Sequence, residues 1–211
     1  MTDDPPDASS VNVHDSELEK KFEIYVELLG KWKNATNLIS EAGFANVWRR
    51  HIADCAQLLA YAPEARRWVD LGSGAGFPGM VIAIQLAECP GTIIHCVESD
   101  KRKAAFLRQV ARATGAPALV HANRIELGDP NSLMPVDAVT ARGLAPLPRL
   151  IDFANVWLRN GAIGIFSCGR SAQDQARKLT QAAQFEIEAY PNKLDSSALI
   201  IRARTAPRAS Q

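Results

Sequence analysis

The stretch WVDLGSGAGFPGM, Trp68–Met80, joins a short apolar run to three glycines at alternate positions, Gly72, Gly74 and Gly76. Glycine accepts positive φ and lets backbone N–H groups approach a bound molecule closely. An apolar run that ends in such a loop is typical of a strand leading into a ligand site. The stretch therefore predicts a strand, a binding loop and a following helix. A turn that merely fits the helix onto the strand is the alternative.

The spacing of this loop differs from that of the common phosphate-binding loops. A dinucleotide fingerprint, G-x-G-x-x-G, would need a glycine at the position of Phe77, and no G-K-[ST] follows as in a P-loop. Asp70 lies two residues before the first glycine, where a carboxylate would repel a pyrophosphate. A ligand with positive charge suits that position better, such as S-adenosylmethionine with its ammonium and sulfonium groups.

A second carboxylate follows the next strand-like run. HCVESD contains Glu98, about 22 residues beyond Gly76. At the tip of a neighbouring strand, a carboxylate can accept hydrogen bonds from both ribose hydroxyls of a nucleoside. Asp100 is better interpreted as the N-cap of the next helix. Together with Asp70 and the glycines, Glu98 predicts S-adenosylmethionine as the ligand.

From residue 66 onward, strand-like runs alternate with helical segments, which predicts an α/β fold with a doubly wound parallel sheet. Only PNKLDSS separates the last two runs, too short for a crossover helix, so this pair should be antiparallel at a sheet edge. Pro78 is expected just inside the first of these helices. The strands are expected at RRWVDL, TIIHCVE, ALVHA, VDAVTA, AIGIFSC, FEIEAY and ALIIRA, and the helices near Phe77, Asp100, Asn123 and Leu147 and after Ser171.

The N-terminal part has helical rather than strand-like periodicity. Apolar residues recur at steps of three or four from His14 to Lys33 and again from Phe44 to Ala60, and Trp48 is expected on the apolar side of the second helix. The acidic, proline-rich MTDDPPDASS favours a disordered leader. The predicted organisation is a leader (1–13), a helical extension (14–62), a methyltransferase domain (63–205) and a tail (206–211).

Composition limits the class of protein. The 211 residues are 47% hydrophobic and 22% charged, and no apolar run approaches the ~20 residues that span a bilayer. The start lacks the features of a signal peptide. The four cysteines form no C-x-x-C pair, so we expect free thiols in the cytoplasm and no metal site. The net charge of +1 means that any nucleic-acid binding must depend on local basic patches.

The end of the fourth strand narrows the choice of methyl acceptor. TARGLAPL lacks the Asn/Asp-Pro-Pro-aromatic run of many enzymes that methylate exocyclic amines. Carbon-5 methylation of cytosine needs a thiolate, for which Cys168 in SCGR is the candidate, but the accompanying Pro-Cys is missing. Guanine N7 carries a free lone pair and needs no general base. Its methylation requires mainly alignment of donor and acceptor.

The sequence resembles the small-subunit rRNA guanine-N7 methyltransferases, the RsmG family, also called glucose-inhibited division protein B or GidB. The resemblance covers the chain from about residue 18. It implies the Rossmann-like fold of class I S-adenosylmethionine-dependent methyltransferases, with N-terminal helices. The motifs that carry it are WKNATNLIS, RRHIADC, VDLGSGAGFPGM, ESDKRKAAFLRQV and VTARGLAPL.

The resemblance also implies functional residues. The cofactor would contact Gly72 and Phe77, and a pair after the third strand, Ile125 and Glu126, would frame its adenine. Arg142 would reach the active site, both as a cofactor contact and in catalysis. The basic residues expected to contact RNA or to close the site are Arg49, Arg50, His51, Lys101, Arg102 and Lys103. For Arg49–His51 a plain helix surface is the alternative, and for Lys101–Lys103 a solvated helix face.

The chain departs from the family at Cys168, where a lysine is usual, and Arg170 is a possible substitute. The implied substrate is a guanine in the decoding-region loop of 16S rRNA. N7 in an A-form helix faces a deep, narrow groove, so the target base must lie in a loop or be extruded. A nearly neutral protein is expected to need the assembled small subunit, and to act as a monomer. Methylation of another acceptor and a non-catalytic cofactor-binding module are the alternatives.

Overall fold

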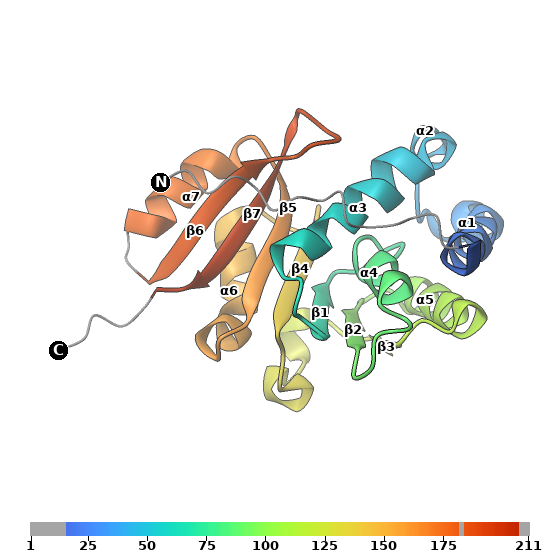
Figure 1. Cartoon of the computed structure of the whole chain (residues 1–211), viewed down its shortest axis with the longest axis horizontal. Coiled ribbons are helices and arrows are strands. Elements are labelled where there is room, and N and C mark those ends of the chain that lie inside the picture. Colours follow the sequence, from blue (N-terminus) through green and yellow to red (C-terminus); the bar gives the residue numbers. More distant parts are fainter. Residues whose placement is uncertain (1–15, 182–183, 207–211) are drawn as a thin grey trace.

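The computed structural model describes residues 16–181 and 184–206, in which one seven-stranded sheet forms the centre (Figure 1). The strand order is β3-β2-β1-β4-β5-β7-β6. The first five strands are parallel, whereas β7 runs antiparallel to both β5 and β6. This confirms the predicted sheet and its antiparallel last pair. The strands are β1 Arg67–Leu71, β2 Ile93–Val97, β3 Ala118–His121, β4 Ala138–Arg142, β5 Ile163–Gly169, β6 Phe185–Pro191 and β7 Ala198–Thr205.

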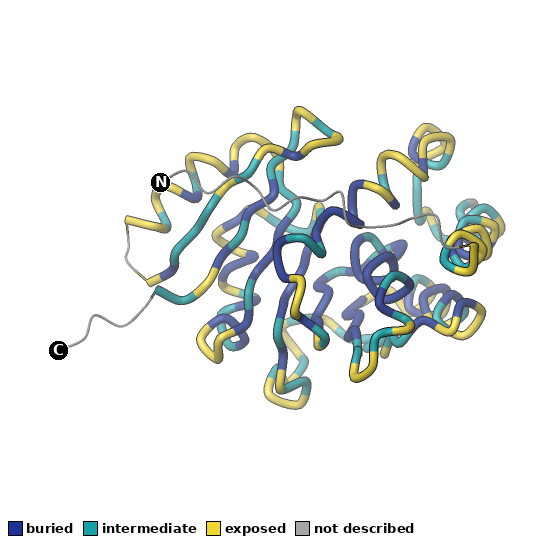
Figure 2. Tube along the Cα trace, viewed as in Figure 1, coloured by how far each residue is buried: buried dark blue, intermediate teal, exposed yellow. Residues whose placement is uncertain are grey.

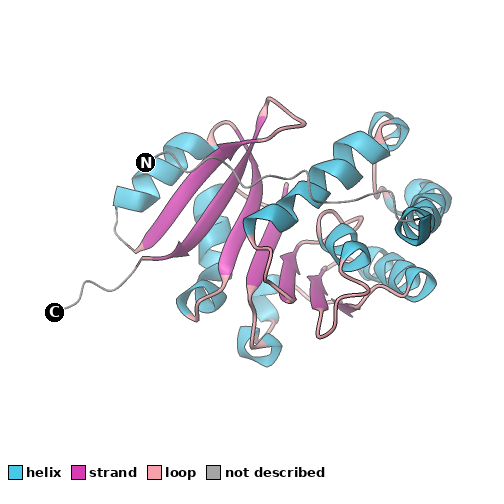
Figure 3. Ribbon diagram, viewed as in Figure 1, coloured by secondary structure: helices cyan, strands magenta, loops and turns pink. Residues whose placement is uncertain are grey.

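Helices cover both faces of this sheet, so that the strands are mostly buried and the outer helix faces are exposed (Figures 2 and 3). One core cluster joins α1, α4 and α5 to one face, and a second joins α6 and α7 to the other. The N-terminal helix α1 therefore shares a core with the sheet. These helices are α1 Ser16–Thr36, α4 Gly79–Gln85, α5 Lys101–Thr114, α6 Leu147–Arg159 and α7 Ala172–Gln181.

The helical stretch predicted over 44–60 is present, but it is interrupted at Asn46 and its winding changes along the chain. The chain forms four short pieces there, α2 Glu41–Ala45, the π-helical turn η2 Trp48–Ala53, α3 Asp54–Ala56 and the 3₁₀ turn η3 Gln57–Tyr61. A π turn contains more residues than an α turn and changes which side chains face the core. Val47 and Ile52, five residues apart, are both buried, whereas Trp48, predicted on the apolar side, is 42% exposed.

Two other predicted boundaries need correction. The helix expected near Phe77 begins at Gly79, so Pro78 is its N-cap rather than a residue inside it, and Asp70 accepts the Gly79 N–H. The short helix expected near Asn123 is a 3₁₀ turn, η4 Ile125–Leu127, followed by a second, η5 Pro130–Leu133. The predicted leader, 1–13, and most of the predicted tail, 207–211, lie outside the described residues.

The register of the strands brings the candidate residues together at the carboxyl ends of the parallel strands. Leu71, the last residue of β1, pairs with Val97 at the end of β2 and with Ala141 near the end of β4. The glycine loop, Glu98 and Arg142 therefore meet at the carboxyl ends of adjacent parallel strands, where α/β sheets bind ligands. Across residues 16–181 and 184–206, no helix combines the length and apolar character needed to cross a bilayer.

Candidate active site

The glycine loop is a tight turn bonded to the neighbouring strand. The N–H groups of Gly72 and Ser73 donate to the carbonyl oxygen of Val97, at 2.9 and 3.1 Å. Gly72 has a φ of +67°, and a Cβ there would lie 2.7 Å from Leu144 Cδ1. A side chain at this position would therefore be strained and would also clash. Gly74 and Gly76 likewise adopt positive φ, as predicted for the loop.

Glu98 is held by the loop that it faces. One of its carboxylate oxygens accepts the Gly74 N–H at 2.8 Å, and the other accepts the Asp100 N–H at 2.8 Å. Asp100 in turn caps α5 by accepting the N–H groups of Arg102 and Lys103, as predicted. Each oxygen of a carboxylate has a further lone pair. The fixed carboxylate of Glu98 is therefore able to accept hydroxyl groups of a bound nucleoside.

Asp70 lies beneath the loop and is fully buried. It accepts hydrogen bonds from Thr140 Oγ1 at 3.0 Å and from the Gly79 N–H at 3.1 Å. Burial raises the pKa of this carboxyl to about 6, although the hydrogen bonds oppose the shift. Asp70 therefore connects β1, β4 and α4 and stabilises the base of the loop. Its contact with a cofactor stays a prediction.

A cleft of about 490 Å³ opens above the loop and gathers many of the predicted residues. These are Gly72, Gly74, Glu98, Lys103, Ile125, Glu126 and Arg142. Residues without a predicted role complete its wall, namely Val97, Ser99, Asn123, Arg124, Gly143, Leu144 and Phe153. The structure thus brings together residues from the ends of four strands and from the turn η4.

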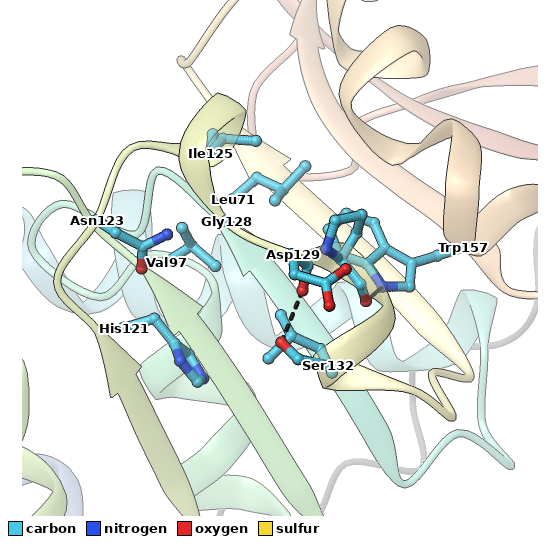
Figure 4. Close-up of a pocket in the computed structure, with 11 residues that line it drawn as sticks. Leu71, Val97, His121, Asn123, Ile125, Gly128, Asp129, Ser132 and Trp157 are labelled. Carbon is cyan, nitrogen blue, oxygen red and sulfur yellow. Dashed lines mark hydrogen bonds between the residues drawn. The ribbon is translucent and has the colours of Figure 1, made fainter.

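A smaller pocket of about 180 Å³ adjoins the cleft and shares Val97, Asn123 and Ile125 with it (Figure 4). Leu71 contributes a further apolar wall. Trp157 closes one side and donates its indole N–H to the Pro130 carbonyl at 3.1 Å. The combination of apolar walls and a few polar groups at the rim is suited to a flat heteroaromatic ring.

On the other side of Arg142 lies a groove of about 600 Å³. Arg142 lines both cavities, so its side chain is part of the wall between the cleft and this groove. The groove is lined by the predicted Arg49, Arg50 and His51, which belong to the π turn. Its remaining lining residues are Ser40, Ala42, Gly43, Asn46, Asp54, Leu194, Asp195 and Ser196.

The Arg142 guanidinium is held by the N-terminal segment. Nη2 donates to the Arg50 carbonyl at 3.0 Å and lies 2.9 Å from His51 Nδ1. Nη1 lies 3.3 Å from Asp54 Oδ2 and 3.3 Å from Cys55 Sγ. Burial, with the positive charges of Arg142 and Arg50, lowers the pKa of His51 to about 4. His51 is therefore neutral at pH 7, and its Nδ1 can accept the arginine N–H.

Other predicted residues lie away from the cleft. The Phe77 ring packs between Tyr25 and His51, with centroids 5.6 and 4.7 Å apart. A Cβ on Gly76 would meet Met80 and Tyr25, so this glycine permits close packing of the loop on the core. Roles in binding the cofactor stay predictions for both, and RNA contact stays a prediction for the exposed Lys101 and Arg102.

Cys168 is part of neither cavity. Burial raises the pKa of its thiol to about 11, so the nucleophilic thiolate is scarce at pH 7. This does not favour carbon-5 methylation of cytosine. The nearby Arg170 donates to the Ser196 carbonyl at 2.9 Å and so supports the β6–β7 loop, which lines the groove.

The sequence matches the GidB family, described as rRNA small subunit methyltransferase G, over residues 18–201. A ribosomal RNA small subunit methyltransferase G from Parvibaculum lavamentivorans is 46% identical, with 85% of this chain and 80% of that protein covered. Its counterpart from Rhodospirillum centenum is 47% identical, with 89% and 84% covered. The chain belongs to this family.

The fold agrees with that family assignment. A SAM-dependent O-methyltransferase from Thermotoga maritima superimposes with a TM-score of 0.58 at 20% identity, covering 80% of this chain and 72% of that structure. The chain therefore has the fold of class I S-adenosylmethionine-dependent methyltransferases, as predicted. The methyltransferase core and the helices before it are both parts of this family's matched region.

Sequence reasoning missed several groups around Arg142. Asp54 lies in RRHIADC, a segment predicted for its basic residues, and Asn192 lies in the turn PNKLDSS. They are 138 residues apart, yet their side chains are hydrogen-bonded. The one indication in the sequence was Asp54, an acidic residue among the apolar residues of a helical segment, because a buried carboxylate needs a hydrogen-bonding partner.

Proposed function

We propose that the chain transfers a methyl group from S-adenosylmethionine to N7 of a guanine in the decoding-region loop of 16S rRNA. The observation that carries the proposal is the position of Arg142 in the wall shared by the cleft and the basic groove. A donor in the cleft and a nucleotide in the groove would meet at this residue. Family membership supports rRNA of the small subunit as the substrate class.

The cleft fits the methyl donor. Gly74 leaves space for close approach of the ligand to the backbone, and Glu98 is placed to accept the ribose hydroxyls. The adenine would enter the adjoining pocket, between Ile125 and the apolar walls formed by Leu71 and Val97 (Figure 4). When bound, S-adenosylmethionine supplies an electrophilic methyl group on a positively charged sulfur.

The groups around the acceptor position suit N7 chemistry. N7 attacks with its own lone pair, so no proton has to be removed from it. Arg142 is a hydrogen-bond donor held in place, and neutral His51 beside it adds no second positive charge. The chain's contribution is alignment of the two reactants and exclusion of water, which can lower a barrier by several kcal/mol.

The groove suits a nucleotide taken out of its stack. Arg49, Arg50 and Arg142 supply positive charge for the flanking phosphates. The proposal includes the assembled small subunit as the substrate, a monomeric enzyme and a cytoplasmic location. The small net charge supports the assembled subunit as the substrate, because non-specific attraction to RNA would be weak and the particle would have to fix the position of the enzyme on the RNA.

Methylation of unmethylated small subunits with radiolabelled S-adenosylmethionine tests the proposal, with the label mapped by chain cleavage at N7-methylguanine. We expect label at a single guanine in the decoding-region loop. Arg142→Ala should lower the rate by about 10²-fold or more. Arg177→Ala, an exposed arginine of α7, is the matched control and should keep the full rate.

Two outcomes would change the proposal. Cofactor binding without label on subunits or on free rRNA would mean that the donor is right and the acceptor wrong, or that the chain only binds its cofactor. Equal rates on naked 16S rRNA and on intact subunits would contradict the requirement for the assembled particle.

A further inference from the structure

Two segments distant in sequence meet in a polar cluster behind Arg142. The cluster consists of Asp54 and Gln57 from the N-terminal segment and Asn192 from the β6–β7 loop. These residues are buried, with exposed fractions of 6%, 7% and 5%. Buried polar groups lower stability unless they are hydrogen-bonded, so their partners indicate what the cluster does.

Asp54 is the centre of this cluster. Its Oδ1 accepts from Asn192 Nδ2 at 2.6 Å and from Gln57 Nε2 at 3.0 Å. Its Oδ2 faces the guanidinium of Arg142, 3.3 Å from Nη1. The carboxylate is therefore held by neutral donors on one oxygen and directs its charge at Arg142 through the other.

Asn192 extends the cluster to the rim of the groove. Its Oδ1 accepts the N–H groups of Leu194 at 2.8 Å and of Asp195 at 3.0 Å, and Gln57 Nε2 lies 3.1 Å away. Leu194 and Asp195 line the groove together with Arg142. The same cluster therefore holds both the arginine and the loop on the opposite wall of the groove.

The other partners of Arg142 are neutral. They are the Arg50 carbonyl, the Cys55 sulfur and His51, whose pKa is lowered so that it carries no charge at pH 7. Asp54 thus supplies the negative charge in direct contact with this guanidinium, and Asp195 on the groove wall adds a second carboxylate that interacts electrostatically with Arg142. The position of the negative charge of Asp54 fixes the orientation of the planar Arg142 guanidinium and of its N–H donors.

We propose that Asp54 is a positioning residue for methyl transfer, which orients Arg142 between cofactor and nucleotide and, through Asn192, holds the β6–β7 loop over the groove. The inference rests on the proposed methyl transfer to rRNA. Asp54 is only 6% exposed at the wall of the groove, and its charge is directed at Arg142. Its effect on the reaction passes through Arg142.

Asp54→Asn is the direct test, measured by steady-state methylation of small subunits. Asparagine keeps an oxygen for Asn192 and Gln57 but presents no charge to Arg142. We expect kcat to fall about 10–100-fold, as for a displacement of a reacting group by about 1 Å. The KM for subunits should change much less than kcat, because Arg49 and Arg50 remain in place.

A double-mutant cycle separates positioning from simple structural support. In an Arg142→Ala background, Asp54→Asn should cause no further loss of kcat, since the residue through which it acts is gone. Equal losses in the two backgrounds would overturn the inference. Asp137→Asn is the matched control, because Asp137 also connects segments by accepting two backbone N–H groups, from Arg66 and Arg67. Asp137 lies at the amino ends of the strands, opposite to the end that carries Arg142, and its substitution should leave kcat unchanged.

A second variant serves if Asp54→Asn does not fold. Asn192→Ala leaves the ion pair intact but removes the donor to Asp54 and the acceptor for the loop. We expect a several-fold lower kcat/KM for subunits in a folded protein, and a wild-type value would overturn the inference. Failure of the wild-type protein to methylate subunits would contradict the proposed function instead, so the two failures are distinguishable.

Discussion

The chemistry of this site depends on the surroundings of a few charged side chains. Arg142 is useful because neutral and acidic partners from the N-terminal segment hold it between two cavities. Asp70 is the contrasting case, a carboxyl fully buried beneath the glycine loop. Its hydrogen bonds from Thr140 and Gly79 only partly compensate for the lost hydration. Burial therefore raises the pKa of Asp70.

The raised pKa of Asp70 predicts a specific dependence of stability on pH. Its pKa is about 6 in the folded protein and about 3.8 when unfolded. Between these values the folded state binds the proton more tightly, so the free energy of unfolding falls as pH rises from about 4 to about 6. The fall attributable to Asp70 is about 3 kcal/mol.

Urea unfolding of the wild type and Asp70→Asn between pH 4 and pH 8 measures this effect. The difference in unfolding free energy between the two proteins should change across the window and level off above pH 7. Carboxyls distant from Asp70 titrate alike in both proteins and cancel in the difference. A difference that stays constant from pH 4 to pH 8 would contradict the raised pKa.

At the scale of elements, the glycine loop is a packed structure between α1 and the sheet. The hydroxyl of Tyr25, on α1, donates to the Ala75 carbonyl of the loop at 2.5 Å. Below the loop, a Cβ on Gly79 would lie 2.5 Å from Asp70 Oδ2 and 2.7 Å from its Cβ. The loop conformation is thus held from both sides before any ligand binds.

Gly79→Ala should therefore destabilise the protein. The added methyl group has to displace the buried Asp70 side chain, and overpacking of this kind lowers the free energy of unfolding by about 1–3 kcal/mol. Gly169→Ala is the control, because no atom lies within 4 Å of the added Cβ. It should change the unfolding free energy by less than about 0.5 kcal/mol. Equal unfolding midpoints in urea for Gly79→Ala and the wild type would refute the packing argument.

At the scale of the whole molecule, positive charge is concentrated in one groove although the net charge of the chain is small. The net charge is +1, yet Arg49, Arg50 and Arg142 face one groove. Binding to RNA should therefore involve few phosphate contacts and depend on those arginines individually. Exposed charges elsewhere, such as the Arg177–Asp174 pair on α7, should contribute little.

The salt dependence of binding tests this distribution. For a decoding-region RNA fragment, Arg49→Ala should reduce the slope of log K against log salt by about 0.7–0.9 if it contacts one phosphate. Arg177→Ala should leave the slope unchanged. Fluorescence anisotropy at several salt concentrations measures both, and identical slopes for all three proteins would exclude a phosphate contact at Arg49.

Local sequence patterns were sufficient to predict much of this structure. The alternation of strands and helices, the short PNKLDSS turn and the spacing of the glycines and Glu98 depend on neighbours along the chain. The sheet and its antiparallel edge are as predicted, and Gly72, Gly74 and Glu98 meet at one cleft. The N-cap at Asp100 is equally local. The sequence by itself thus determined the fold class and the general location of the cleft.

The tertiary structure alone decided how the N-terminal segment serves the site. The neutral state of His51 depends on its burial and on Arg142, and the cluster of Asp54 and Asn192 depends on contacts with the β6–β7 loop. The π turn at Trp48–Ala53 places the Arg50 carbonyl and His51 beside Arg142. Those partners lie about 90 to 138 residues away along the chain. A periodic pattern contains no information on such pairings, because they form only when the folded sheet brings the ends of its strands together.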